Sequence, residues 1–169
     1  KIILVQNWYI IFVAAVVPIV MGFVWYNPKV MGTIWMAETG MTEEKSEKTH
    51  MPLVFGLSYL FSCMIAIALL VFTIHQIHVF SVFEGQAGLE VDGSDLMNKI
   101  TNFLGDDIHN FRTFKHGAFH GTMAGVLLAL PILATNAMFE AKGFKYIAIN
   151  AGYWIVSLAL MGGIVCQWA

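Results

Sequence analysis

Four histidines at helical spacing are the residues of this chain that could hold a metal ion. His75 and His78 lie three positions apart at the end of one apolar stretch, and His116 and His120 lie four positions apart at the start of the next. Residues three or four apart share one face of a helix. Imidazole nitrogen is a common ligand of zinc and other divalent transition metals. The two pairs therefore predict a divalent metal site, provided that the helices carrying them lie side by side.

Other roles for these histidines stay open. An imidazole near a membrane interface can hydrogen bond to backbone carbonyls or lipid headgroups and have only a structural part. It can also change its charge near neutral pH and serve a proton-linked role. Axial ligation of a haem needs histidines at matching depth on facing helices, whereas these lie near helix ends. The glutamate of the HExxH zinc-protease motif does not occur between His116 and His120, so catalysis has no support beyond the histidines themselves.

The composition shows what kind of elements must position these histidines. Of the 169 residues, 58% are hydrophobic and only 12% are charged, and the mean hydropathy is +0.71. Soluble domains are usually about half apolar and a quarter charged. The formal net charge of −2 gives no basic field that could attract nucleic acid. These values exclude a nucleic-acid binder, a disordered chain and an ordinary soluble enzyme, and they indicate that the lipid bilayer is a partner.

Long stretches almost free of charged residues predict an all-α membrane protein. A helix that crosses a bilayer needs about 20 mostly apolar residues. Lipid offers no hydrogen-bond partner to an open backbone, so each such stretch must be helical. We expect a single four-span domain over residues 1–169. Its transmembrane helices are placed near residues 7–27, 52–76, 117–139 and 145–167.

Each of the two longer loops predicts a further helix. Apolar residues recur at helical spacing between Val30 and Trp35, which indicates a short interfacial helix in loop 1–2. In the polar loop 77–115, Ser94 has the character of an N-cap. The apolar residues after it predict an amphipathic helix in loop 2–3 that lies on the membrane surface. These residues are Leu96, Met97, Ile100, Phe103 and Leu104.

Small residues repeat along one face of each of the last two spans. Small side chains let helix backbones approach closely, and packing of this kind drives helix association in lipid. The loop between the two spans is short, so the spans are antiparallel neighbours. We expect their small-residue faces to pack on each other, with a homo-oligomer or a partner helix as the alternative. The residues concerned are Gly117, Gly121 and Gly125 in span three, and Gly152, Ala159 and Gly163 in span four.

Several motifs taken together resemble a known family. They are Trp25-Tyr26-Asn27-Pro28, Trp35-Met36, Phe114-Lys115-His116-Gly117-Ala118-Phe119-His120-Gly121 and Asn150-Ala151-Gly152-Tyr153-Trp154. The chain is similar in these motifs to a bacterial family of small membrane proteins catalogued as domain of unknown function number seventeen sixty-one. The resemblance covers most of the chain except the region 84–110, which looks like an insertion. It implies a four-span protein of the bacterial inner (cytoplasmic) membrane, and it implies no reaction.

These features lead to two functional hypotheses. The first is a non-catalytic integral membrane protein, a small accessory or stabilising subunit of a larger inner-membrane assembly, bound to another membrane protein or to further copies of itself. The second is a metal- or small-ligand-binding or transport module that uses the histidines at one membrane face. No ionised residue lies in the middle of a span, which argues against ion-coupled transport by this chain alone.

Overall fold

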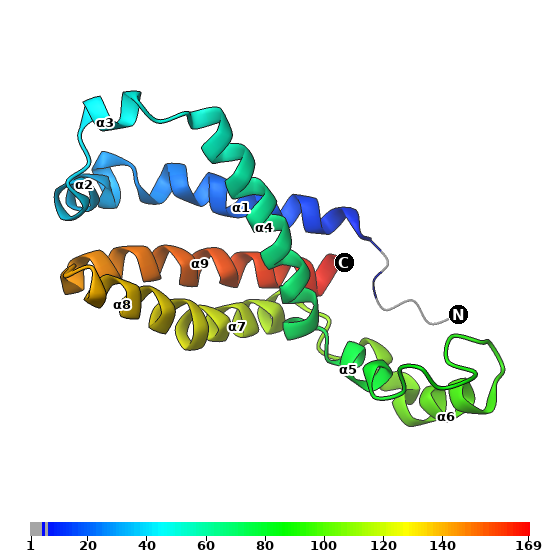
Figure 1. The fold of residues 1–169 in the computed structure, drawn as a ribbon. Helices are drawn as coiled ribbons and strands as arrows, with labels where there is room; N and C mark the ends of the chain where they lie inside the picture. The colour runs from blue at the N-terminus through cyan, green and yellow to red at the C-terminus, as the bar shows by residue number, and fades with distance from the viewer. Residues whose placement is uncertain (1–4, 6) are drawn as a thin grey trace.

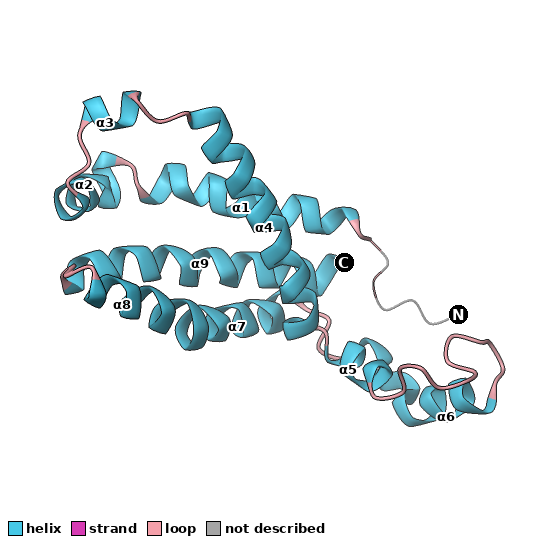
Figure 2. Cartoon of the chain, in the orientation of Figure 1, coloured by secondary structure: helices cyan, strands magenta, loops and turns pink. Residues whose placement is uncertain are grey.

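The computed structural model describes residue 5 and residues 7–169, which form helices joined by turns and loops (Figure 1). Three helical segments are long and apolar enough to cross a membrane: Met51–Thr73 (α4), Phe114–Phe139 (α7 and α8) and Phe144–Trp168 (α9). A fourth candidate span is bent, because α1 (Tyr9–Trp25) meets the segment Pro28–Thr39 at 55°. The described chain is thus all-helical with three or four candidate spans, which indicates an integral membrane protein (Figure 2).

The bend after α1 follows from its local sequence. Asn27 has an extended backbone (φ −63°, ψ 138°), as expected for a residue that precedes proline. Its side-chain oxygen accepts a hydrogen bond from the backbone N–H of Lys29 at 3.0 Å. A π-helical turn (Pro28–Gly32), α2 (Thr33–Thr39) and α3 (Glu43–Glu47) follow. The straight part of the first predicted span, residues 7–27, is therefore the 17-residue helix α1.

Glycines bring the backbones of α7 (Phe114–Ala124) and α9 into direct contact. A Cβ atom on Gly117 would lie 2.1 Å from the carbonyl oxygen of Gly162, and one on Gly121 would lie 2.0 Å from that of Leu158. Gly125 approaches α9 in the same way, since its Cβ would lie 2.7 Å from the Cα of Ile155. It opens a π-helical turn (Gly125–Ala129) that leads into α8 (Leu130–Phe139). The tight hairpin after α8 makes α9 antiparallel to α7 and α8 (Figure 1).

The small residues of α9 face more than one neighbour. Ala159 lies against Gly121 of α7, and Gly163 packs against the ring of Phe114 at the start of α7. Gly152 instead faces the indole of Trp25 on α1. This division arises because α9 lies between α1 and the α7–α8 segment (Figure 1). The core forms where α1, α4 and α9 meet, and its fully buried side chains include Ala14, Ala66, Leu69, Met161 and Val165.

The second span ends at Thr73, earlier than the predicted residue 76. Ile74 is extended (φ −106°, ψ 93°) and its side chain is fully buried. A separate helix, α5 (His75–Ser81), begins directly after it. The histidine pair predicted at the end of the span therefore lies on α5, whose direction differs from that of α4 (Figure 1).

The loop between spans two and three folds into a small unit at the end of the bundle (Figure 1). It contains α5, α6 (Asp95–Leu104) and a 3-10 turn (Gly105–His109). Ser94 caps α6 by accepting the backbone N–H of Met97 at 3.1 Å. The sequence predicts that the apolar face of α6 lies on the membrane. In the structure Met97, Ile100 and Leu104 are buried against α5 and the loop around it, because these elements supply hydrophobic partners.

Replacing Gly121 with alanine should force α7 away from α9 and destabilise the hairpin. Overpacking of a tightly packed core costs about 1–3 kcal/mol, so the midpoint of thermal unfolding in detergent should fall. Gly56→Ala in α4 is the matched control, since no described atom lies within 4 Å of the added Cβ. Its midpoint should stay constant or rise, because alanine favours helix over glycine. Equal midpoints for the two variants would contradict the contact.

Candidate metal site

Three histidine rings meet at one end of the helix bundle. The ligand nitrogens of His75, His116 and His120 all lie within 4.8 Å of one another. The Nε2 atoms of His75 and His116 are 3.0 Å apart. The centroids of the three rings are separated by 4.5 to 4.9 Å. His75 is exposed and the other two rings are half-buried, so the cluster is open to an ion that arrives from outside the bundle.

Two local features place these rings. His75 is the first residue of α5, and the buried, extended Ile74 before it fixes where that helix starts. His116 and His120 are one helical turn apart on α7 and therefore share a face. The start of α7 is capped by Thr113, whose side-chain oxygen accepts the backbone N–H of His116 at 3.3 Å. Each ring is thus carried by a helix whose first turn is held in place.

His78 lies outside this group. Its Nε2 atom is 2.9 Å from the carbonyl oxygen of Val71 in the last turn of α4. The His78 ring therefore hydrogen bonds to the backbone of α4, on the other side of the break at Ile74. The structure brings together three of the four histidines that the sequence predicts as ligands. His75 comes from α5, and His116 and His120 come from α7.

The remaining two histidines lie elsewhere. His109 is exposed in the 3-10 turn that follows α6. His50 lies at the opposite end of α4, where its Nδ1 atom accepts the backbone N–H of Leu53 at 3.2 Å. Neither belongs to the cluster of ligand nitrogens that the described residues form.

Aromatic rings flank the cluster on α7 and before it. The ring of Phe111 lies 5.1 Å from that of His116, and the ring of Phe119 lies 5.6 Å from that of His120. Phe111 and Phe119 are themselves 63% and 61% exposed, so they pack beside the ligand rings without closing the cluster to water. The two half-buried histidines share α7, and the exposed His75 on α5 is the ligand that a bound ion would join to them.

The spacing of the nitrogens suits either a shared proton or a metal. At 3.0 Å, one of the two Nε2 atoms must donate a hydrogen bond and the other accept it. Two nitrogens bound to the same tetrahedral zinc ion lie about 3.3 Å apart, given Zn–N bonds near 2.0–2.1 Å. For His75 and His116, a nitrogen separation greater by about 0.3 Å would therefore let a metal ion replace the shared proton. Three ligands of this kind leave a fourth position open.

Arg112 joins the start of α7 to the end of α9. Its Nε atom donates to the carbonyl oxygen of Cys166 at 2.8 Å, and its Nη2 atom donates to the carbonyl oxygen of Ala169. Carbonyls in the last turn of a helix have no partner within the helix and attract cations. Partial burial lowers the pKa of the Arg112 guanidinium, although an arginine remains protonated at physiological pH. The guanidinium therefore stays charged and holds the start of α7 against the end of α9, a contact that we call the Arg112 clamp.

Two further contacts close the same corner. The backbone N–H of Phe114 donates to the side-chain oxygen of Gln167 at 2.9 Å. The thiol of Cys166 lies 3.6 Å from the carbonyl oxygen of Thr73 and 3.4 Å from that of Phe111. The ends of α4 and α9 and the start of α7 are thereby tied together directly beneath the histidine cluster.

Sequence reasoning did not identify this clamp. Arg112 attracts notice as the single arginine of the chain, placed just before an apolar span. Its partners, however, are backbone carbonyls more than 50 positions away, and any residue type supplies a carbonyl. The sequence therefore holds a signal for the donor and none for the acceptor.

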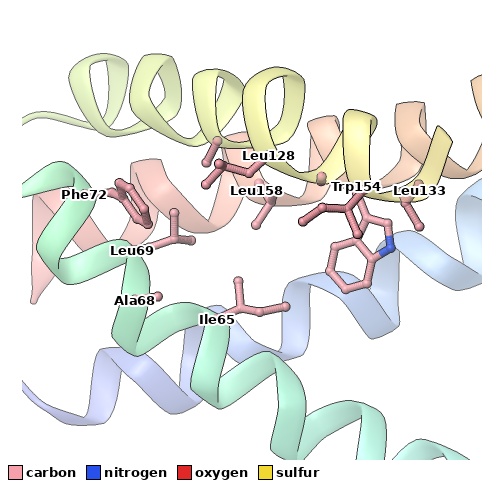
Figure 3. A pocket seen from close by; sticks show the side chains of 11 residues that line it. Ile65, Ala68, Leu69, Phe72, Leu128, Leu133, Trp154 and Leu158 are labelled. Atoms are coloured by element: carbon pink, nitrogen blue, oxygen red, sulfur yellow. The ribbon is translucent and has the colours of Figure 1, made fainter. Parts of the chain in front are cut away.

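A groove lies along the membrane-spanning part of the molecule. Hydrophobic side chains from α4, from the α7–α8 segment and from α9 line a groove of about 330 Å³, as Figure 3 shows. Leu69, Leu128 and Trp154 are among these side chains. None of the side chains that line this groove could ligate a metal, so the histidine cluster remains the candidate metal site.

Replacing Arg112 with methionine should loosen the corner that carries the histidines. A hydrogen bond from a charged group contributes roughly 1.5–3 kcal/mol, and Arg112 donates to two carbonyls, so the free energy of unfolding should fall by at least about 1.5 kcal/mol. Arg112→Lys should restore only part of it, because an ammonium group lacks the planar fork of guanidinium. Urea or SDS unfolding measures the difference. Wild-type stability in the methionine variant would refute the clamp.

Comparison with known proteins agrees with the family expected from the sequence motifs. No curated protein and no solved structure matches the chain. One family model does match, and it covers residues 9–166, which is nearly the whole chain. That range includes α1, all three histidines of the cluster and the glycines between α7 and α9. The chain therefore belongs to the family described as "Protein of unknown function (DUF1761)".

Proposed function

We propose that this protein is an integral membrane protein of the bacterial inner membrane that binds a divalent transition-metal ion at one end of its helix bundle. The observation that carries the proposal is the convergence of His75, His116 and His120. Their nitrogens lie within 4.8 Å of one another although His75 and His116 are 41 positions apart in the chain. Two backbone elements must be held in register to produce this arrangement, and the corner beneath the cluster holds them.

The donor set favours particular metals. Three neutral imidazole nitrogens suit zinc, copper, nickel or cobalt, whereas magnesium and calcium prefer oxygen ligands. Zinc with three protein ligands keeps a fourth position for water or an exchangeable group. A partly exposed site with an open position lets an ion enter and leave. The proposed role is therefore reversible uptake of the ion at the membrane face.

The rest of the molecule supports binding rather than passage through the bilayer. The uncharged middle parts of the spans offer no charged or imidazole ligand along a path across the membrane. Transport of an ion by a single chain usually needs such groups at mid-bilayer. We therefore assign the ion to one membrane face.

Titration with Co²⁺ tests the proposal, because bound cobalt absorbs visible light in a way that reports its coordination. We expect one ion per chain in detergent solution, displaced by Zn²⁺. Replacing His75, His116 or His120 with alanine should each weaken binding by at least about tenfold, since loss of even an outer partner of a ligand costs roughly 10–100-fold. At a zinc concentration of about 100 times Kd, the wild-type protein should gain about 2.7 kcal/mol of stability.

His78→Ala and His109→Ala are the matched controls. Each removes an imidazole from the same end of the molecule, and neither residue belongs to the cluster. Both variants should bind Co²⁺ as the wild type does. If His78→Ala weakens binding as strongly as His116→Ala, the ion is held by a different set of ligands. If no metal changes the spectrum or the thermal midpoint of the wild type, the proposal fails.

A second candidate role is that of an accessory subunit, and one observation favours it. The unit outside the candidate spans carries large hydrophobic side chains that are mostly exposed. Val82, Phe103 and Phe111 have exposed fractions of 73%, 76% and 63%. A partner protein, a further copy of this chain or the lipid surface would cover them.

The native mass of the protein purified from its own host in mild detergent tests this second role. A fixed mass excess over the 18.8 kDa chain, which fragment sequencing assigns to another polypeptide, would support the subunit role. A mass equal to one chain plus detergent would overturn it. Replacing Phe103 with serine should release a partner held by this surface and leave Co²⁺ binding unchanged.

A further inference from the structure

A second polar and aromatic site lies at the other end of α4 from the histidines. A cavity of about 560 Å³ opens between the end of α1, the start of α4, the π-helical turn and α2. Tyr153 of α9 also lines it. The volume lies within the range of about 300–1,000 Å³ that is typical of small-molecule sites. The cavity includes the Trp25-Tyr26-Asn27-Pro28 segment in part, a motif that the metal site does not use.

Aromatic rings form two walls of this cavity. Tyr26 packs against Trp35 and against Tyr153, with 5.2 Å between ring centroids in each case. Phe23 of α1 and Phe55 of α4 also line the cavity and are stacked, 5.6 Å apart and 25° from parallel. Aromatic faces favour stacked or edge-on contact with another flat ring. The walls therefore suit a planar guest.

The polar groups of the cavity are neutral, and its two tyrosine hydroxyls already donate their hydrogens within the protein. The hydroxyl of Tyr26 donates to Asn150 Oδ1 at 3.0 Å, and that of Tyr153 donates to the carbonyl oxygen of Pro18 at 2.7 Å. Asn27 uses its oxygen to accept from the backbone of Lys29, so its amide nitrogen is the end that can donate to a guest. Ser58 adds a hydroxyl. None of the described lining residues is ionised at neutral pH.

The cavity opens toward lipid rather than toward a closed interior. Phe23 and Val54, which line it, are 63% and 42% exposed and belong to candidate spans. A guest would therefore enter from the bilayer and keep an apolar tail there. It would need a neutral flat ring with oxygen atoms that accept hydrogen bonds.

We propose that this cavity binds the ring of a neutral, membrane-soluble molecule that carries carbonyl oxygens, the chemistry of a quinone. The ring would lie between the aromatic walls, its carbonyl oxygens would accept from Asn27 and Ser58, and its tail would leave between α1 and α4. The inference is independent of the metal site, which lies at the far end of α4.

Quenching of tryptophan fluorescence by a decyl-substituted benzoquinone tests the proposal, with the protein in phospholipid nanodiscs. We expect saturable quenching that is largely lost in Trp35→Phe. Gly22→Leu places a side chain in the cavity, since an added Cβ would meet no described atom closer than the Tyr153 hydroxyl at 3.9 Å. This variant should weaken binding by at least about tenfold.

Gly56→Leu is the matched control, because it makes the same change in a candidate span at a residue that does not line the cavity. It should bind the quinone as the wild type does. Decylbenzene, which has the same tail and a flat ring but no carbonyl, should not compete. Quenching that is linear and equal in all variants overturns the proposal. Equal competition by decylbenzene overturns the recognition of carbonyl oxygens. Because Co²⁺ binding is read separately, either result leaves the metal site untouched.

Discussion

The contact of backbone on backbone between α7 and α9 is the constraint on which the rest of the structure depends. Two apolar helices gain little from mutual burial when lipid is the solvent, so close packing and hydrogen bonds must hold them together. Gly117 and Gly121 let α7 approach until a Cβ atom would touch the opposite carbonyls. Arg112 then fixes the register of this pair, because its guanidinium can reach the carbonyls at the end of α9 only when α7 begins there.

The histidine cluster is a consequence of that register. Once the start of α7 is fixed beside the end of α9, the positions of His116 and His120 in the first turns of α7 are fixed as well. The thiol of Cys166 links the same corner to the carbonyl of Thr73, where α4 ends. The chain then turns at the buried Ile74, and His75 is the next residue. The cluster thus forms where the end of α4, the start of α7 and the end of α9 meet.

Hydropathy was enough to predict the all-helical class, and of the four predicted spans the structure shows three or four candidates. The motifs were enough to predict the family, which the match over residues 9–166 confirms. The separation of His78 from the other histidines was not predictable, because the sequence predicts a continuous α4, whereas the backbone turns at Ile74 and His78 then contacts the carbonyl oxygen of Val71. One extended residue, Ile74, changes that direction. The apolar face of α6 is a similar case: periodicity identifies the face, but a membrane and the neighbouring α5 are equally good hydrophobic partners for it.

The two candidate sites differ in the way that their places in the bilayer require. The histidine cluster follows the end of α4, where imidazole ligands can replace the water bound to an ion without the ion entering the hydrocarbon. The aromatic cavity is built from neutral groups between the walls of two spans, where a charged guest would be costly and an apolar one would not. Between them lies the packed core around Ala66, Leu69 and Met161. The histidine cluster and the aromatic cavity are therefore separated by the packed hydrophobic side chains of three helices.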